Sequence, residues 1–176
     1  MSVIQKASRD CLIPSSILSR ASIKNDGRIS IETMTFNILI VDDSLSMRAV
    51  IKKIIGMSGI RTEKCYEAQN GLEALEVLAG NWVDIILSDI NMPEMNGIEF
   101  LKALRSDQLF KEIPVVFIST EANTERIKEA TLLGARGFLK KPFVPEELRK
   151  LLFEVLGLSS EGEYGDNDQN SEEMDF

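Results

Sequence analysis

The sequence predicts an α/β fold in which a doubly wound parallel sheet of five strands is flanked by helices in a single domain. Apolar runs alternate five times with segments of helical periodicity between residues 36 and 157. The strongest of these runs are continuously apolar, as in strands that helices cover on both faces. The length of 176 residues, 44% of them hydrophobic, suits one domain with a sizeable core and some additional chain.

The first unit begins with "FNILIVDD" at 36–43, a continuous apolar strand that ends in two acidic residues. The apolar residues that follow recur at helical spacing and are expected on one helical face: Met47, Val50, Ile51, Ile54 and Ile55. A helix is therefore predicted directly after this strand.

The other four units repeat the order of strand and helix. Strands are expected at 61–68, 83–89, 113–120 and 135–141, of which the first is the weakest. The helices that follow are marked by Leu72, Leu75 and Leu78, by Ile98, Leu101 and Leu104, by Ile127, Ala130 and Leu133, and by Leu148, Leu151, Leu152 and Val155. Asn70 with Glu73 resembles a capping box, and Pro145 suits a first helical turn.

Right-handed connections place the carboxyl ends of all five strands at one edge of the sheet, where open α/β sheets bind ligands. The residues expected at this edge are Asp42, Asp43, Asp89, Ser119, Thr120, Lys140 and Lys141. Any one of them is explained by the general polarity of strand ends. Three converging carboxylates, however, repel one another unless a cation lies between them. An oxygen-rich cluster without His favours Mg²⁺ over Zn²⁺.

This set of groups suits the acceptance of a phosphoryl group. Asp89 can act as a nucleophile that forms an aspartyl phosphate, and Lys141 with a nearby hydroxyl can stabilise the phosphoryl oxygens. The chain contains no His. The phosphoryl group is therefore expected to come from another molecule, such as a phosphohistidine on a partner or a small acyl phosphate.

Four segments, "ILIVDDSLSMR", "IILSDINMPEMNG", "PVVFISTEA" and "GFLKKPF", resemble in order and spacing the motifs of CheY-like receiver domains of two-component response regulators. The resemblance covers residues 36–157 and implies a flavodoxin-like, CheY-like fold. It also implies a signalling protein rather than an enzyme, one that assists its own phosphorylation and dephosphorylation. The expected donor is a histidine kinase, and the expected output is docking to a protein target, with chemotaxis as the implied pathway.

The resemblance assigns roles to individual positions. Asp89 corresponds to the phosphoacceptor, Asp43 to a direct Mg²⁺ ligand, and Asp42 to a ligand through water. Asn91 corresponds to a ligand through its backbone carbonyl. The remaining matched positions are Ser119 (switch hydroxyl), Phe138 (switch aromatic) and Lys141 (the lysine of the pattern), and the implied docking surface is formed by the fourth helix, fifth strand and fifth helix.

Some positions depart from the pattern or need separate interpretation. Thr120 stands where the family usually has Ala or Gly, and Phe138 replaces the Tyr of the best-known chemotaxis regulators. Lys140 is expected to be a solvated charge, because only Lys141 directly precedes Pro142 as the motif requires. The family pattern also suggests a cis peptide bond before Pro142.

The sequence divides into a poorly ordered arm (1–34), the receiver domain (35–158) and an acidic disordered tail (159–176). The net charge is −8, and the tail carries seven acidic residues and no Lys or Arg. It is interpreted as a solubilising tail, or as a flexible acidic segment that presents Met174 and Phe176 as a short docking element. No output domain is recognised at either end, so output is expected to occur by docking.

Between the arm and the tail, positive and negative charges nearly cancel. This argues against nucleic acid as a partner, because binding to a phosphate backbone needs a concentrated basic surface. Two cysteines, Cys11 and Cys65, offer no disulfide framework, and the chain shows neither a secretory signal nor an apolar stretch long enough to span a membrane. A cytoplasmic location is expected.

Three alternatives remain open at this stage. A phosphorelay intermediate would use the same site to pass the phosphoryl group to a His-containing phosphotransfer protein. A phosphatase of the haloacid-dehalogenase type would need a second acid two residues after Asp89, where the chain has Asn91. A degenerate receiver would bind partners without phosphorylation, against which the intact acids, hydroxyl and lysine argue.

Overall fold

A computed structural model describes residues 35–120 and 123–158 of the chain. Within these residues, the strands are β1 (Phe36–Val41), β2 (Thr62–Ala68), β3 (Ile85–Ser88), β4 (Val115–Ser119) and β5 (Gly137–Lys140). The helices are α2 (Leu45–Met57), α3 (Gly71–Gly80), α4 (Gly97–Ser106), α5 (Thr124–Leu132) and α6 (Pro145–Leu156). None of these helices has the length and apolar character of a membrane span. The predicted arm and tail, with Cys11, Met174 and Phe176, lie outside the described residues.

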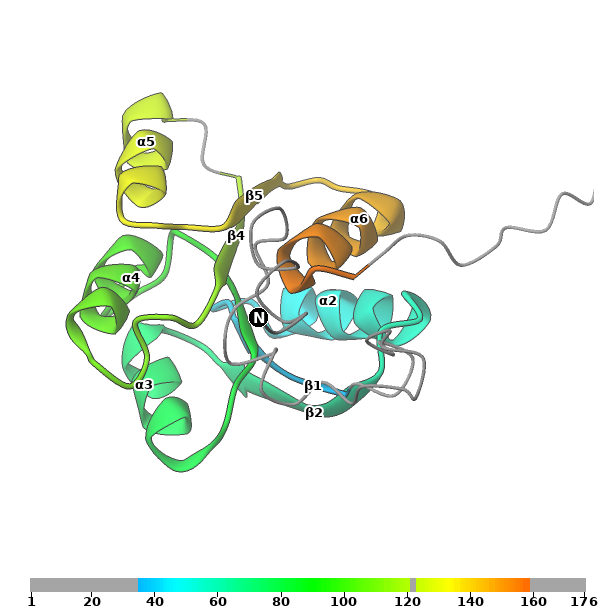
Figure 1. The fold of residues 1–176 in the computed structure, drawn as a ribbon. Coiled ribbons are helices and arrows are strands. Elements are labelled where there is room, and N and C mark those ends of the chain that lie inside the picture. Colours follow the sequence, from blue (N-terminus) through cyan, green and yellow to red (C-terminus); the bar gives the residue numbers. More distant parts are fainter. Residues whose placement is uncertain (1–34, 121–122, 159–176) are drawn as a thin grey trace, which may run out of the picture.

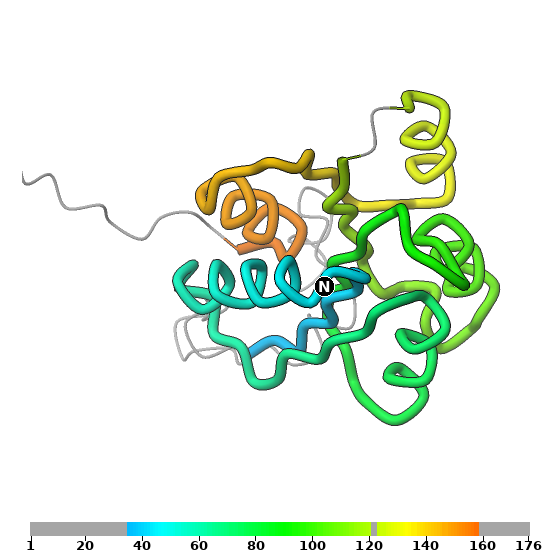
Figure 2. The backbone as a smooth tube through the Cα atoms, turned by 180° about the vertical axis from the view of Figure 1, so that it is seen from behind, coloured from blue at the N-terminus to red at the C-terminus, as the bar shows by residue number. Residues whose placement is uncertain are grey.

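The five strands form one parallel sheet in the order β2-β1-β3-β4-β5. Helices α2 and α6 lie on one side of this sheet, and α3, α4 and α5 lie on the other (Figure 1). The view from behind shows the same division (Figure 2). The predicted doubly wound α/β fold with five parallel strands is therefore confirmed. From β1 the chain continues first to β2 on one side and later to β3 on the other, so the direction of winding reverses between β1 and β3.

Two apolar cores flank the sheet. The core on the α2 and α6 side includes Ile38, Ile40, Ile51, Ile55, Leu148 and Leu152. The core on the other side includes Leu39, Val41, Leu78, Phe100, Leu104 and Phe117. Strands β1, β3 and β4 contribute to both cores and are buried along their whole length, which explains their continuous apolar sequences.

Two apolar residues assigned to buried helical faces are in fact exposed. Val50 is 48% exposed and Leu72 is 45% exposed. Val50 directly precedes Ile51, and one residue corresponds to about 100° around a helix. Because Ile51, Ile54 and Ile55 face the sheet, Val50 is turned to the flank of α2. The apolar stripe of this helix is thus narrower than the sequence predicted.

Helix caps fix where the polypeptide enters each helix. The Asn70 side chain accepts a hydrogen bond from the Glu73 N–H at 2.9 Å, while the Glu73 carboxylate accepts from the N–H of Gln69 at 2.8 Å. The predicted cap of α3 therefore forms, although its reciprocal bond reaches one residue further back than in a capping box. Asn96 and Glu99 form a complete capping box at α4.

Gly97, the first residue of α4, is packed against the backbone of the loop that follows β3. A Cβ atom at this position would lie 2.3 Å from the Asp89 carbonyl oxygen and 2.9 Å from the Ile90 Cα. Because both atoms belong to the backbone, Gly97→Ala should lower the free energy of unfolding by about 2 kcal/mol or more, measured by urea denaturation. Gly56→Ala is the matched control: a Cβ there meets nothing within 4 Å, so stability should rise by about 0.5 to 1 kcal/mol. Equal stability of the two variants would contradict this account.

Candidate functional site

Three aspartates meet at the carboxyl edge of the sheet. Asp42 and Asp43 follow β1, and Asp89 follows β3, its neighbour in the sheet. Each offers a carboxylate oxygen, and these oxygens lie within 4.8 Å of one another. The structure thus brings together the three carboxylates that the sequence placed at this edge, at the point where the winding reverses.

Asp89 is 9% exposed, and its side chain is held by four donors. Its Oδ1 accepts hydrogen bonds from the backbone N–H of Ile90 at 2.6 Å, the N–H of Asn91 at 3.2 Å and the Ser119 hydroxyl at 2.6 Å. Its Oδ2 accepts from Lys141 Nζ at 3.0 Å. These donors offset the cost of burying a carboxylate. They also leave Oδ2 as the oxygen with fewer partners.

Lys141 bridges two of the aspartates. Its Nζ lies 2.6 Å from Asp42 Oδ2 and 3.0 Å from Asp89 Oδ2, and its side chain is 10% exposed. Burial lowers the pKa of this ammonium group, but the hydrogen bonds to Asp42 and Asp89 outweigh burial and raise the pKa above its ordinary value. Lys141 is therefore a fixed positive charge at neutral pH. The neighbouring Lys140 is exposed, as expected for a solvated charge, and the Lys141–Pro142 peptide bond is cis.

The two aspartates after β1 differ in exposure. Asp42 is 1% exposed, and its Oδ1 accepts a hydrogen bond from the Ser44 N–H at 2.9 Å. Arg48 donates to the backbone carbonyl of Asp42 at 2.7 Å and fixes this turn from the first part of α2. Asp43 is exposed and lies on the open side of the cluster. The cluster thus has an inner carboxylate and an outer one.

The predicted switch residues lie on adjacent strands. Ser119 ends β4 with its hydroxyl on Asp89, while Phe138 on β5 is half-buried against Phe117, with ring centroids 5.4 Å apart. The Ser119 hydroxyl thus donates directly to the carboxylate that the sequence predicts as the phosphoacceptor. Thr120 is exposed.

Arg126 is a residue near the site that sequence reasoning missed. It lies on α5, and its guanidinium donates to the side-chain oxygen of Asn91 at 2.7 Å. This bond connects α5 to the loop after Asp89. Nothing in the sequence distinguished Arg126 from a solvated helix residue, because its partner is 35 positions away.

The donor set fits a hard divalent cation. It consists of carboxylate oxygens, with the open side formed by an exposed aspartate. Such cations prefer oxygen ligands and retain several waters, which an open side accommodates. Lys141 occupies one oxygen each of Asp42 and Asp89, so a cation at this site would compete with the ammonium group for them.

This fold and this site define a receiver domain of the kind used in phosphoryl signalling. The chain matches the family model of the response regulator receiver domain over residues 38–153, and it belongs to that family.

Similar proteins include chemotaxis regulators. Chemotaxis protein CheY1 of Helicobacter pylori is 41% identical over 121 residues, which is 68% of this chain and 96% of the relative. The CheY homolog of Campylobacter jejuni is 36% identical over 124 residues, 70% of this chain and 94% of the relative. The structure of chemotaxis protein CheY4 of Vibrio cholerae is similar with a TM-score of 0.64 and 38% identity, covering 70% of this chain and all of that one (100%). The predicted chemotaxis-type receiver is confirmed, and the phosphorelay and phosphatase alternatives are not favoured.

Proposed function

We propose that this receiver accepts a phosphoryl group on Asp89 from the phosphohistidine of a histidine kinase and then docks to a protein target in chemotaxis, in the cytoplasm. The observation that carries the proposal is the arrangement around Asp89: the Lys141 ammonium on Oδ2 and the Ser119 hydroxyl on Oδ1, beside two further aspartates. This arrangement supplies a nucleophile together with donors for the phosphoryl oxygens.

The less occupied oxygen, Asp89 Oδ2, is the proposed nucleophile. It forms an O–P bond while the P–N bond of the donor breaks, and the electron pair of that bond stays on the leaving imidazole nitrogen. Lys141 moves from the carboxylates toward a phosphoryl oxygen, and Ser119 donates to another. Asp43 and Asp89, with Asp42 through water and the Asn91 carbonyl, are proposed to hold Mg²⁺. The ion would neutralise charge on the phosphoryl oxygens.

Incubation with Mg²⁺ and acetyl phosphate tests this proposal. Mass spectrometry should show one added phosphoryl group, located on the peptide that contains Asp89. An unmodified mass under conditions in which a known receiver is labelled would favour a degenerate receiver instead.

Asp43→Asn should weaken Mg²⁺ binding about tenfold or more and slow labelling by acetyl phosphate. The change removes one ligand charge from the outer side of the cluster. It should not destabilise the metal-free fold, because it relieves repulsion among three carboxylates. Mg²⁺ affinity can be measured by titration of the Asp89 and Ile90 amide signals, with Asp107→Asn as a control away from the site. Unchanged Mg²⁺ affinity would remove Asp43 from the ligand set.

Ser119→Ala should be labelled on Asp89 yet respond weakly to labelling. A hydrogen bond to a charged acceptor shifts a two-state equilibrium by about one to two orders of magnitude. Without it, the equilibrium constant for the switched state should fall by that factor, and the change in the Phe138 signals on phosphorylation should be smaller than in the wild type. Thr120 is exposed, so Ser119→Ala/Thr120→Ala should behave like the single variant. A full wild-type change at Phe138 in Ser119→Ala would contradict the coupling.

The proposed docking surface consists of α5, β5 and α6, which correspond to the fourth helix, fifth strand and fifth helix of the receiver pattern. Leu132 at the end of α5 is 89% exposed, and Val144 just before α6 is 53% exposed. Exposed apolar side chains at α5 and just before α6 support an interaction surface formed by these elements.

A further inference from the structure

Helix α5 buries little of its surface against the rest of the domain. Of its residues, all of which the structure describes, only Ala130 is buried. The neighbouring α4 has five buried residues, which include Phe100 and Leu104. Figure 1 shows α5 at one end of the layer that it forms with α3 and α4. Because α5 gains little from apolar packing, its position depends strongly on its polar contacts.

The C-terminal end of α5 is anchored by one arginine of α4. The Arg105 guanidinium donates to the carbonyl of Leu133 at 3.1 Å and to that of Gly134 at 3.0 Å, directly after the helix. It also donates to the carbonyls of Lys111 and Ile113, in the segment between α4 and β4. Four backbone carbonyls thus share one half-buried cation, which fixes this end of α5.

The N-terminal part of α5 is bonded to the loop after Asp89. Arg126 donates to Asn91 Oδ1 at 2.7 Å. The backbone N–H of Asn91 in turn donates to Asp89 Oδ1 at 3.2 Å. Two hydrogen bonds through Asn91 therefore connect α5 with the carboxylate of Asp89. One such bond changes an equilibrium constant by a factor of about three to ten, which biases two arrangements without locking either.

We propose that Arg126 is a positioning residue, whose hydrogen bond to Asn91 couples the arrangement of the Asp89 site to the position of α5. With this bond in place, the loop presents its backbone N–H groups to Asp89, and α5 is held on the loop. A target that binds α5 would alter the Asp89 site through the same bond, since coupling between two sites acts equally in both directions. The proposal rests on the proposed function for the roles of Asp89 and α5, but the coupling itself can be tested without phosphorylation.

Amide hydrogen exchange of the metal-free full chain tests the coupling. In Asn91→Ala, exchange at Ala130 should become about threefold faster or more, although the substitution lies outside α5. Arg126→Ala should have at least this effect, and adding Asn91→Ala to it should cause no further change. This double-mutant cycle isolates the bond to Asn91 from every other contact of Arg126.

Two further variants separate this role from a general effect on the helix. Arg126→Lys should recover most of the wild-type behaviour, because an ammonium group can also donate to Asn91 Oδ1. Lys128→Ala changes the charge of the same helix by the same amount at an exposed position. This control should match wild type.

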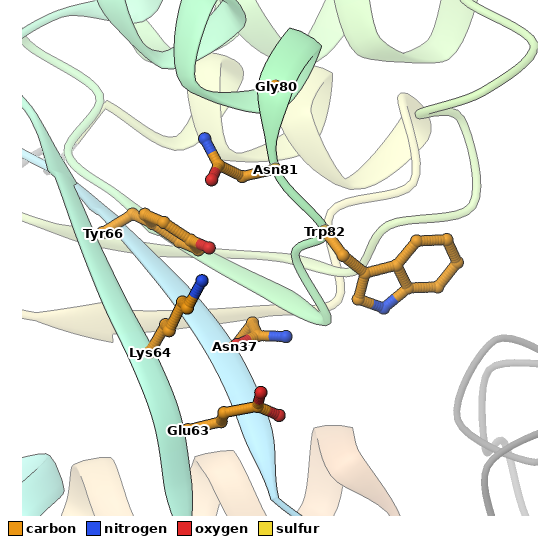
Figure 3. A pocket seen from close by; sticks show the side chains of 7 residues that line it. All are labelled: Asn37, Glu63, Lys64, Tyr66, Gly80, Asn81 and Trp82. Atoms are coloured by element: carbon orange, nitrogen blue, oxygen red, sulfur yellow. The ribbon is translucent and has the colours of Figure 1, made fainter.

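Trp82 shows whether each variant remains folded. It is the only tryptophan of the chain, and its indole N–H donates to Asp84 Oδ1 at 2.9 Å. It precedes β3, at the opposite end of this strand from Asp89, and lines a hollow of about 540 Å³ (Figure 3). Its fluorescence during urea unfolding should show one cooperative transition in every variant.

Labelling by acetyl phosphate at a fixed Mg²⁺ concentration tests the functional part. Arg126→Ala should be labelled about threefold more slowly or more, because the loop samples arrangements in which its N–H groups no longer face Asp89. In an Asn91→Ala background, the same substitution should have no further effect. Arg126→Lys should restore much of the wild-type rate.

The proposal is overturned if Asn91→Ala leaves exchange at Ala130 unchanged, if the two substitutions act additively, or if Lys128→Ala has the same effects. Labelling of Arg126→Ala at the wild-type rate would also overturn it, because Arg126 would then not position the site. If the wild-type protein is not labelled at all, the proposed function fails instead, and the exchange cycle still decides whether Asn91 and α5 are coupled.

Discussion

Asp89→Asn is expected to abolish labelling by acetyl phosphate, because the amide replaces the nucleophilic oxygen and removes one charge from the proposed metal site. The fold should persist. The side-chain oxygen of Asn can still accept from Ile90, Asn91 and Ser119, as Asp89 Oδ1 does. The new NH₂ group would face Lys141 Nζ, where Oδ2 now accepts at 3.0 Å, so that ion pair would be lost.

Asp107→Asn provides the matched control for this experiment. Asp107 lies after α4, and its Oδ1 accepts the N–H of Leu109 at 2.7 Å, a bond that Asn preserves. This variant should be labelled at the wild-type rate. Undiminished labelling of the Asp89→Asn protein would place the phosphoacceptor elsewhere, and loss of labelling in both variants would point to a general defect.

The sequence sufficed to predict that the aspartates converge, because topology alone determines this. Parallel strands with right-handed connections must end at one edge. Acidic residues directly after β1 and β3 therefore become neighbours although about 45 positions separate them. Lys141 was assigned to the same edge for the same reason.

The detailed contacts of the site could not be predicted in this way. Which oxygen Lys141 contacts, and that it bridges two carboxylates, depends on side-chain conformations that strand order does not determine. The bond from Arg126 to Asn91 depends on how α5 lies over the loop after β3. Asn37 is a similar case, since a polar residue inside an apolar run gave no indication that its side-chain oxygen would be buried without a hydrogen-bond partner among the described residues.

The contacts of Lys141 lead to a second large effect. In Lys141→Met, two buried carboxylates lose their shared cation, and removing one partner of a buried ion pair typically costs about 3 to 5 kcal/mol. The metal-free variant should therefore be less stable than wild type by about 3 kcal/mol in urea unfolding. Added Mg²⁺ should restore a large part of this loss, because it binds only the folded state.

The same substitution should increase Mg²⁺ affinity about tenfold or more, because the ammonium no longer competes for Asp42 Oδ2 and Asp89 Oδ2. The variant should accept phosphate slowly but fail to switch, since the group proposed to connect the phosphoryl to β5 is absent. Amide signals of α5 and β5, recorded before and after addition of Mg²⁺ and acetyl phosphate, measure this response. Lys140→Met, one residue away and exposed, should match wild type in all three measurements. A Lys141→Met protein with unchanged Mg²⁺ affinity and a full shift of β5 would show that Lys141 neither competes with the metal nor transmits the signal.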